Sequence, residues 1–258
     1  MEILDEIKKD YVQDLIRRGK RPDERGFEEY RKITIEPNVL KSAEGSAKVR
    51  MGDTQILVGI KFGVGAPFAD RPKEGVLATN AELLPLASPS FEPGPPDERS
   101  IELARVVDRG IRSAGVIDLE SFFIDEGKVW ALFIDLYVLD YDGNLIDAAA
   151  LAAMSALLNA KWPKYENGHV IRNEYQGNLK IDKNKKVVAC TFAKINGSVV
   201  LDPCLDEEIA MSARLSLATT GEHLCAAQKA GSGSFTRDEI VKLTDLALAK
   251  GSELRALI

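Results

Sequence analysis

The sequence has few of the residues that most often build catalytic, redox or metal sites. Among its 258 residues are two histidines and three cysteines. Cys190, Cys204 and Cys225 lie far apart without CxxC spacing, which argues against a disulfide framework and a zinc site and favours reduced core thiols. His169 and His223 have no serine or cysteine partner at a recognisable spacing, so we expect no catalytic triad. We expect no metal ion and no cofactor.

Long apolar runs and an excess of positive charge are also missing. No window is long and apolar enough to span a bilayer, and the N-terminus lacks a signal-peptide core, so we expect a soluble, cytoplasmic protein without a membrane partner. The formal net charge is -6. This excludes a basic field over the whole chain of the kind that attracts nucleic acids. Any contact with RNA must come from a local basic stripe or from a partner's charge.

The residues that are present indicate a globular protein with one large or two modest domains. Strand and helix patterns alternate along the chain, which predicts a mixed α/β (α+β) architecture of two lobes. We place the lobes at residues 1–165 and 186–258, with a polar connecting segment at 166–185. The expected helices cover residues 2–18, 98–114, 148–159 and the C-terminal stretch from Thr236. The expected strands cover residues 30–36, 45–50, 55–61, 76–84, 122–124, 129–139, 187–195, 199–202, 215–219 and 225–229.

Two segments carry further structural expectations. In the first helix, Ile3, Ile7, Tyr11 and Leu15 recur at helical spacing and predict its apolar face. Residues 63–75 are rich in glycine, proline and charge, which predicts an exposed loop.

The helix expected over residues 98–114 carries a basic stripe. At 100° per residue, Arg105, Arg109 and Arg112 fall within about 60° of one another, opposite an apolar face. Three outward guanidiniums suit phosphate oxygens. A solvated helix face, whose arginines pair with Asp108 and Glu102, accounts for the same pattern and is favoured by the pattern alone.

Four carboxylates near the end of the chain form an acidic cluster: Asp202, Asp206, Glu207 and Glu208. Such a cluster can bind Mg²⁺ or supply a general acid. A solvated acidic turn explains it equally well.

Five stretches, which follow one another over nearly the whole chain, resemble the RNase PH family of phosphate-dependent 3′-to-5′ exoribonucleases. They lie at residues 21–25 with 29–33, 45–54, 102–109, 138–148 and 196–203. In the first, Glu24 replaces the family's usual glycine. The resemblance implies an N-terminal lobe like ribosomal protein S5 domain 2 and a smaller α/β C-terminal lobe.

The sequence departs from the family at two places that matter for catalysis. Active members carry a G-G-T-R-T-A turn whose N–H groups and arginine hold the attacking phosphate. Here the turn includes Gly143 and Asn144, and Ile146 stands where the arginine should be. Of two aspartates in a later D-S-A-A-x-x-D stretch, Glu208 retains a carboxylate and Arg214 reverses the charge of the second. Phosphate positioning and acid catalysis would both be lost, so we expect no catalytic residue in this chain.

These departures, with the proline-rich segment 89–98, resemble the non-catalytic ring subunits of archaeal exosomes. The resemblance implies a hexameric ring, three of each, with a catalytic RNase PH-like subunit, RNA-binding cap subunits, and single-stranded RNA in the central channel. It implies RNA contacts by Arg105 and Arg109, with Arg112 next. Two alternatives stay open: an autonomous phosphorolytic exoribonuclease with a site around Glu208, and a free-standing RNA-binding protein.

Overall fold

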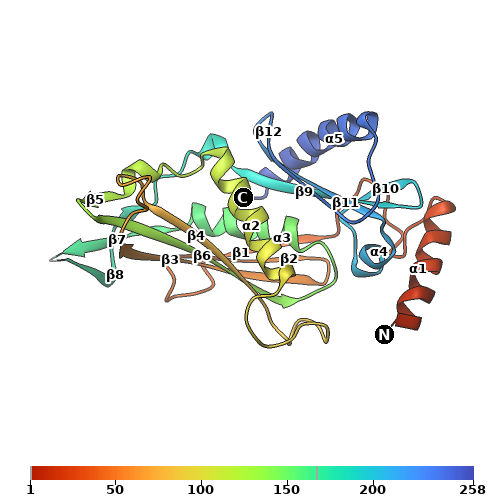
Figure 1. Cartoon of the computed structure of the whole chain (residues 1–258), viewed down its shortest axis with the longest axis horizontal. Coiled ribbons are helices and arrows are strands. Elements are labelled where there is room, and N and C mark those ends of the chain that lie inside the picture. The colour runs from red at the N-terminus through yellow and green to blue at the C-terminus, as the bar shows by residue number, and fades with distance from the viewer. Residues whose placement is uncertain (1, 167) are drawn as a thin grey trace.

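The computed structural model describes residues 2–166 and 168–258 and has the mixed α/β architecture that the sequence predicts (Figure 1). The larger sheet has the strand order β1-β2-β3-β6-β4, and β5 pairs with β6 at one end. Strands β4 and β6 run parallel, and the other pairs of this sheet are antiparallel. These strands are β1 (Ile33–Pro37), β2 (Gly45–Met51), β3 (Thr54–Gly65), β4 (Val76–Leu83), β5 (Phe123–Asp125) and β6 (Lys128–Asp140).

The smaller sheet has the order β10-β9-β11-β12 and is antiparallel throughout. Its strands are β9 (Val187–Ile195), β10 (Ser198–Leu201), β11 (Ala213–Thr220) and β12 (His223–Ala230). Helix α5 (Arg237–Arg255) packs on this sheet, and α1 (Glu2–Arg17) packs on the short helix α4 (Leu205–Ala210) at its far end.

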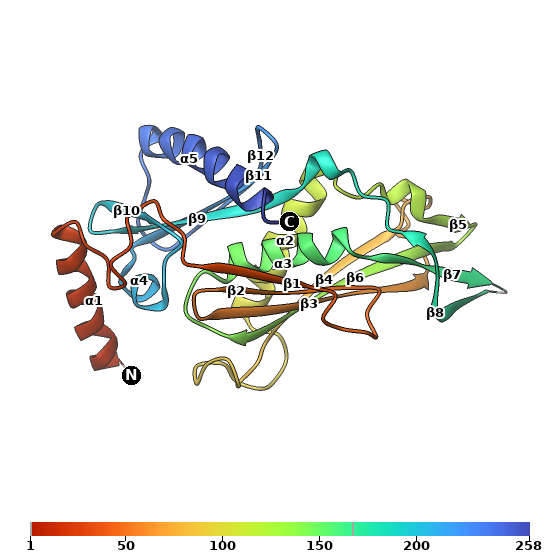
Figure 2. The same cartoon turned by 180° about the vertical axis from the view of Figure 1, so that it is seen from behind.

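Two helices lie between the sheets, as Figure 2 shows from behind. Helix α3 (Leu145–Leu158) contacts β2 and β3 on one side and β9 on the other, and α2 (Glu98–Ala114) contacts β4, β9, β11 and β12. The small side chains of α3, rich in alanine, let both sheets approach it, and nearly all of its residues are buried. One apolar core therefore runs through both lobes.

Local sequence signals define both ends of α2. The side chain of Asp97 accepts a hydrogen bond from the N–H of Ser100, which caps the helix start. Gly115 ends the helix with a left-handed conformation at φ +60°. The predicted bounds, 98–114, are confirmed.

Four expectations about the elements were wrong. The first concerns the apolar face of α1: Ile7 and Tyr11, which were expected on it, are exposed, and Val12 and Ile16 are buried against the smaller sheet instead. The side chain of Ile3 lies outside the described residues. The second concerns the loop expected at residues 63–75: strand β3 continues through residues 63–65, so the loop begins after them. The expected strand at 122–124 is split between the 3-10 helix η1 (Leu119–Phe122) and β5. Helix α3 begins three residues before the predicted start at 148.

The polar segment after α3 contains a hairpin that its weak pattern did not predict. It consists of β7 (Lys161–Glu166) and β8 (His169–Asn178), followed by the short 3-10 helix η2 (Lys183–Lys185). The hairpin register shifts twice around Pro163, which breaks the alternation that reveals a strand. The lobe boundaries at residues 165 and 186 stay a prediction.

Candidate functional site

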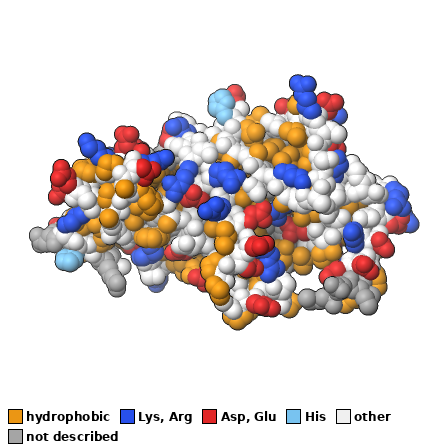
Figure 3. Space-filling view, viewed as in Figure 1, with side chains coloured by type: hydrophobic (Ala, Val, Ile, Leu, Met, Phe, Trp, Pro, Cys, Tyr) orange, Lys and Arg blue, Asp and Glu red, His pale blue; other side chains and the backbone are white. Residues whose placement is uncertain are grey.

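The three stripe arginines of α2 are all exposed. Figure 3 shows positively charged side chains gathered over α2 in the middle of this face. Their surroundings differ. Arg112 is held by Asp108, with Nε 2.6 Å from Oδ2, and by the carbonyl oxygen of Leu77, 2.5 Å from Nη2. Both partners belong to the protein, so Arg112 is the least available of the three.

Arg109 and Arg105 have fewer contacts with other side chains than Arg112 has. Arg109 donates one hydrogen bond from Nη1 to Oε1 of Gln228 on the edge strand β12, at 2.9 Å. Arg105 makes no side-chain hydrogen bond or ion pair within residues 2–166 and 168–258. An exposed guanidinium without an internal partner can offer all its N–H groups to a phosphate.

The turn at the start of α3 carries no cation. Gly143 and Asn144 adopt left-handed conformations, at φ +80° and +52°, and Ile146 is 4% exposed in the apolar space between α2, α3 and the smaller sheet. An isoleucine at this position packs the core and offers no charge to an anion.

Glu208 occupies the N-terminus of α3. Its Oε1 accepts the N–H of Asn144 at 2.9 Å, and its Oε2 accepts the hydroxyl of Tyr141 at 2.6 Å. Burial raises the pKa of Glu208, while the hydrogen bonds from Tyr141 and Asn144 act in the opposite direction. Because the N-terminus of a helix attracts anions, this carboxylate stands where an external anion would otherwise bind.

Arg214 on β11 occupies the second carboxylate position of the family, and its side chain binds an acid of α2. Its Nη2 lies 2.9 Å from Oε1 of Glu102 on α2, and the side chain is only 15% exposed. Gln228 donates to the same Oε1 at 3.4 Å. Positions 208 and 214 therefore supply one carboxylate and one guanidinium, in separate contacts, where active family members have two carboxylates.

The acidic cluster predicted from the sequence is dispersed. Glu207 forms a two-pronged ion pair with Arg21, both distances 2.7 Å, and neither side chain is exposed. Asp206 pairs with Lys8 at the surface. Asp202 is fully buried. Within residues 2–166 and 168–258 no group of three His, Cys, Asp or Glu side chains could hold a metal ion. Neither the metal nor the solvated-turn interpretation describes Asp202 or Glu207.

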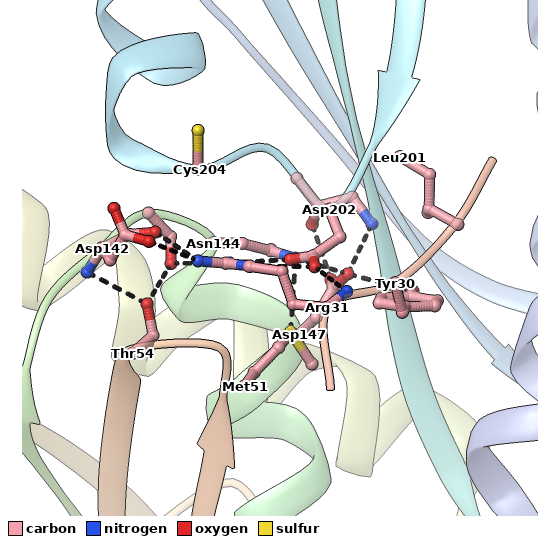
Figure 4. A network of polar contacts seen from close by, with 12 residues as sticks. Tyr30, Arg31, Met51, Thr54, Asp142, Asn144, Asp147, Leu201, Asp202 and Cys204 are labelled. Carbon is pink, nitrogen blue, oxygen red and sulfur yellow. Dashed lines mark hydrogen bonds and ion pairs between the residues drawn. The ribbon is translucent and has the colours of Figure 1, made fainter. Parts of the chain in front are cut away.

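Asp202 belongs to a buried polar network between the lobes (Figure 4). Arg31 binds its two oxygens at 3.0 and 2.8 Å, and Arg25 and Asn144 add bonds of 3.0 and 2.7 Å. Burial opposes its ionisation, but the bonds and charge of Arg31 hold the pKa of Asp202 below its ordinary value. The charged residues at 21–26 have the pattern of a turn and give no sign of a distant buried partner, so sequence reasoning missed this network.

Asp147, on the first turn of α3, extends the network into the smaller sheet. Its carboxylate accepts bonds from the N–H and hydroxyl of Thr191 on β9, at 2.9 and 2.7 Å, and from Asn144 and Tyr30. Complete burial raises the pKa of Asp147 to about 7, although the bonds from Asn144 and Thr191 favour the charged form. The two lobes are thus joined through buried charge as well as apolar contact.

The remaining candidates are placed apart from these groups. Cys190 and Cys204 are buried, Cys225 is partly buried, and all three are free thiols. His169 begins β8 and His223 begins β12, both at the surface. No helix within the described ranges is long and apolar enough to cross a membrane.

Comparisons with known proteins agree with this architecture. Residues 29–163 match domain 1, and residues 186–250 match domain 2, of the 3′ exoribonuclease family, RNase PH. The exosome complex component Rrp42 of Methanothermobacter thermautotrophicus is 50% identical over 258 residues, covering 98% of this chain and 95% of that protein. Its counterpart in Thermococcus kodakarensis is 51% identical, covering 99% and 95%.

Solved structures show the same fold. A chain of the Archaeoglobus fulgidus exosome with RNA bound to the active site superposes with a TM-score of 0.90 at 44% identity, covering 98% of both chains. A chain of an archaeal exosome core gives 0.85 at 40% identity, covering 98% of this chain and 96% of that one. The resemblance inferred from the five sequence stretches is confirmed: this chain belongs to the RNase PH family of 3′ exoribonucleases and contains both of its domains.

Proposed function

We propose that this chain is a non-catalytic ring component of an archaeal exosome, a complex that degrades RNA from the 3′ end by phosphorolysis. Membership of such a complex is supported by its relatives, which are exosome components, and by its likeness to chains of two archaeal exosome structures. A catalytic RNase PH-like sister subunit would supply the phosphate site and the acid, with three copies of each chain in the ring. RNA-binding cap subunits would deliver substrate, and the ring would work in the cytoplasm.

One observation carries the assignment of a silent subunit. At the start of α3, where the family resemblance expects a phosphate, the carboxylate of Glu208 accepts the Asn144 N–H at 2.9 Å and Ile146 is buried. A phosphate dianion there would meet the negative charge of Glu208. The arginine that contacts this turn, Arg31, is already committed to Asp202 and to the carbonyl oxygens of Asp142 and Gly143. Catalysis by phosphorolysis depends on electrostatic stabilisation of that dianion, so its loss removes the largest contribution to the rate.

The retained role is RNA binding by the stripe. Arg105 and Arg109 are exposed on α2 and have few or no partners within the protein, so they are the best candidates for contacts with RNA phosphates near a neighbouring active site. Arg112 ranks below them because Asp108 and Leu77 already bind it. The net negative charge of the chain fits a basic channel that is local and shared between subunits.

Phosphate-dependent release of nucleoside diphosphates tests the proposal. The purified chain, given single-stranded RNA and phosphate, should release none, and addition of the catalytic sister subunit should start the reaction. Native mass measurement should find the mixed ring only when both chains are present. Product formed by the chain alone would identify an autonomous exoribonuclease. Tight RNA binding by the monomer would identify a free-standing RNA-binding protein.

A further inference from the structure

The side chains around Arg105 suggest how the stripe is kept available. Two acids of α2, Glu102 and Asp108, lie three or four residues before an arginine of the stripe. Asp108 lies four residues before Arg112, and the two side chains form an ion pair of 2.6 Å. This is the contact that helix geometry favours, and it commits Arg112 to the protein.

Glu102 lies three residues before Arg105, a spacing that also allows an ion pair on a helix, yet the two are not paired in the structure. Its Oε1 instead accepts Nη2 of Arg214 at 2.9 Å and Nε2 of Gln228 at 3.4 Å. Both partners come from the smaller sheet, Arg214 from β11 and Gln228 from the edge strand β12. The carboxylate is thereby turned away from its own helix.

Gln228 has a second role in the same group of residues. Its amide donates to Glu102 and its carbonyl oxygen accepts Nη1 of Arg109, at 2.9 Å. The chain of hydrogen bonds therefore runs from Arg214 through Glu102 and Gln228 to Arg109. Arg214 is only 15% exposed and Glu102 33%, so this ion pair is shielded from solvent more than most pairs on the surface.

We infer that Arg214 and Gln228 are positioning residues for the RNA-binding stripe: they sequester Glu102, which leaves Arg105 free and orients Arg109. The inference rests on the proposed function, because it presumes that the stripe binds RNA phosphates. The arginine that replaces the family carboxylate at position 214 would then have a function of its own. An aspartate at position 214 would repel Glu102 and release it toward Arg105, whereas an arginine holds it.

The experiment uses the ring assembled with the catalytic sister subunit and a labelled single-stranded RNA, without phosphate so that no RNA is degraded. Arg214→Met should release Glu102 and weaken RNA binding roughly three- to tenfold, with a salt slope lower by about 0.7 for each RNA phosphate that the ring no longer binds. Adding Glu102→Gln to this variant should restore most of the affinity. Arg105→Ala with Arg109→Ala serves as the reference for removal of the stripe.

The outcomes separate the inference from the proposed function. If the double variant stays as weak as Arg214→Met, then Arg214 acts on RNA directly or only supports the fold, and the inference fails. If Arg214→Met binds normally while removal of Arg105 and Arg109 weakens binding, the inference fails and the proposed role of the stripe survives. If removal of the two arginines has no effect, the proposed role itself fails.

A second variant covers the case in which Arg214→Met does not assemble. Gln228→Ala removes a partly buried amide from the edge strand β12 and should change the melting temperature of the ring far less than the loss of the Arg214 ion pair. It should weaken RNA binding roughly two- to fivefold, because Glu102 loses one of the two groups that hold it away from Arg105 and Arg109 loses the hydrogen bond that orients it. Unchanged affinity of this variant would overturn the inference as well.

Discussion

At the residue scale, the proposed loss of the phosphate site depends on Glu208 and Ile146, which act in two different ways. Ile146 replaces a cation with buried apolar surface, and Glu208 fills the anion position with a carboxylate of the same chain. Because Tyr141 and Asn144 both donate to that carboxylate, it is fixed there without needing a charged partner. Restoring one family residue should therefore not restore the site.

Ile146→Arg should produce no phosphorolysis in the isolated chain and should destabilise it. The arginine would enter the apolar space between α2, α3 and the smaller sheet, where an unpaired charge costs on the order of 3–5 kcal/mol. Ile146→Val, the matched control, should cost only about 0.5–1.5 kcal/mol. Denaturant unfolding and a nucleoside diphosphate assay measure both results. Activity in the arginine variant would show that Glu208 does not block the turn.

Asp147 should make stability depend on pH in an unusual direction. Its pKa rises to about 7 in the folded chain, against about 4 for an unfolded aspartate, so the folded state binds more protons between these values. The free energy of unfolding should then fall as pH increases from about 4 to 7, by up to roughly 4 kcal/mol. Asp202, with a lowered pKa, contributes stability that is lost only as pH falls further.

Asp147→Asn tests this assignment. The amide cannot ionise, so the decrease in unfolding free energy between pH 4 and 7 should flatten, whatever the substitution costs at all pH values. Asp206→Asn, which removes a carboxylate from an exposed pair with Lys8, is the control and leaves the network untouched. An unchanged pH profile in Asp147→Asn would assign the slope to another group.

At the element scale, the buried ion pair of Arg21 and Glu207 joins α4 to the segment that follows α1. The guanidinium also donates to the carbonyl oxygens of Leu201 and Asp202, both at 2.9 Å, so every prong of the fork is used. Removing one partner leaves the other charge buried without compensation.

Glu207→Gln should therefore lower the free energy of unfolding by about 3–5 kcal/mol, measured by denaturant titration. The preceding residue provides the comparison. Asp206→Asn breaks the exposed pair with Lys8 and should cost less than about 1 kcal/mol. Similar decreases in the two variants would mean that burial of the Arg21 pair contributes little to the fold.

The same contrast explains what the sequence could predict. Sequence patterns located α2 and its outward arginines, because these depend on residues within one helix. The buried pair of Arg21 and Glu207 joins residues far apart in sequence, and a charged run gives no sign that a distant carboxylate will enclose one of its members. The prediction of the buried face of α1 was wrong for a related reason. Val12 and Ile16 are buried because they pack in one cluster with Ala193 and Val200 of the smaller sheet, which lie far away in the sequence.

At the scale of the whole molecule, the lobes form one support for α2. Helix α2 packs on β4 of the larger sheet and on β12 of the smaller one, and the network around Asp202 and Asp147 fixes the two sheets relative to each other. The stripe is thus presented by a rigid surface, although the partners of Arg112 and Arg109 come from different lobes. Under the proposed function, a net charge of -6 leaves this local arrangement as the main source of attraction for RNA.

Charge reversal of the stripe tests that conclusion on the assembled ring. Arg105→Glu with Arg109→Glu should weaken binding of single-stranded RNA at least about tenfold and reduce its salt slope by about 0.7 for each phosphate that is no longer neutralised. Arg17→Glu with Arg18→Glu changes the net charge equally but lies at the C-terminal end of α1, where both arginines already pair with Asp14. If affinity depended on net charge alone, both pairs of substitutions would weaken binding equally. A selective decrease in the stripe variant, with ring mass unchanged, would assign the attraction to α2, because the guanidiniums of Arg105 and Arg109 face outward there without an acid of the same helix to neutralise them.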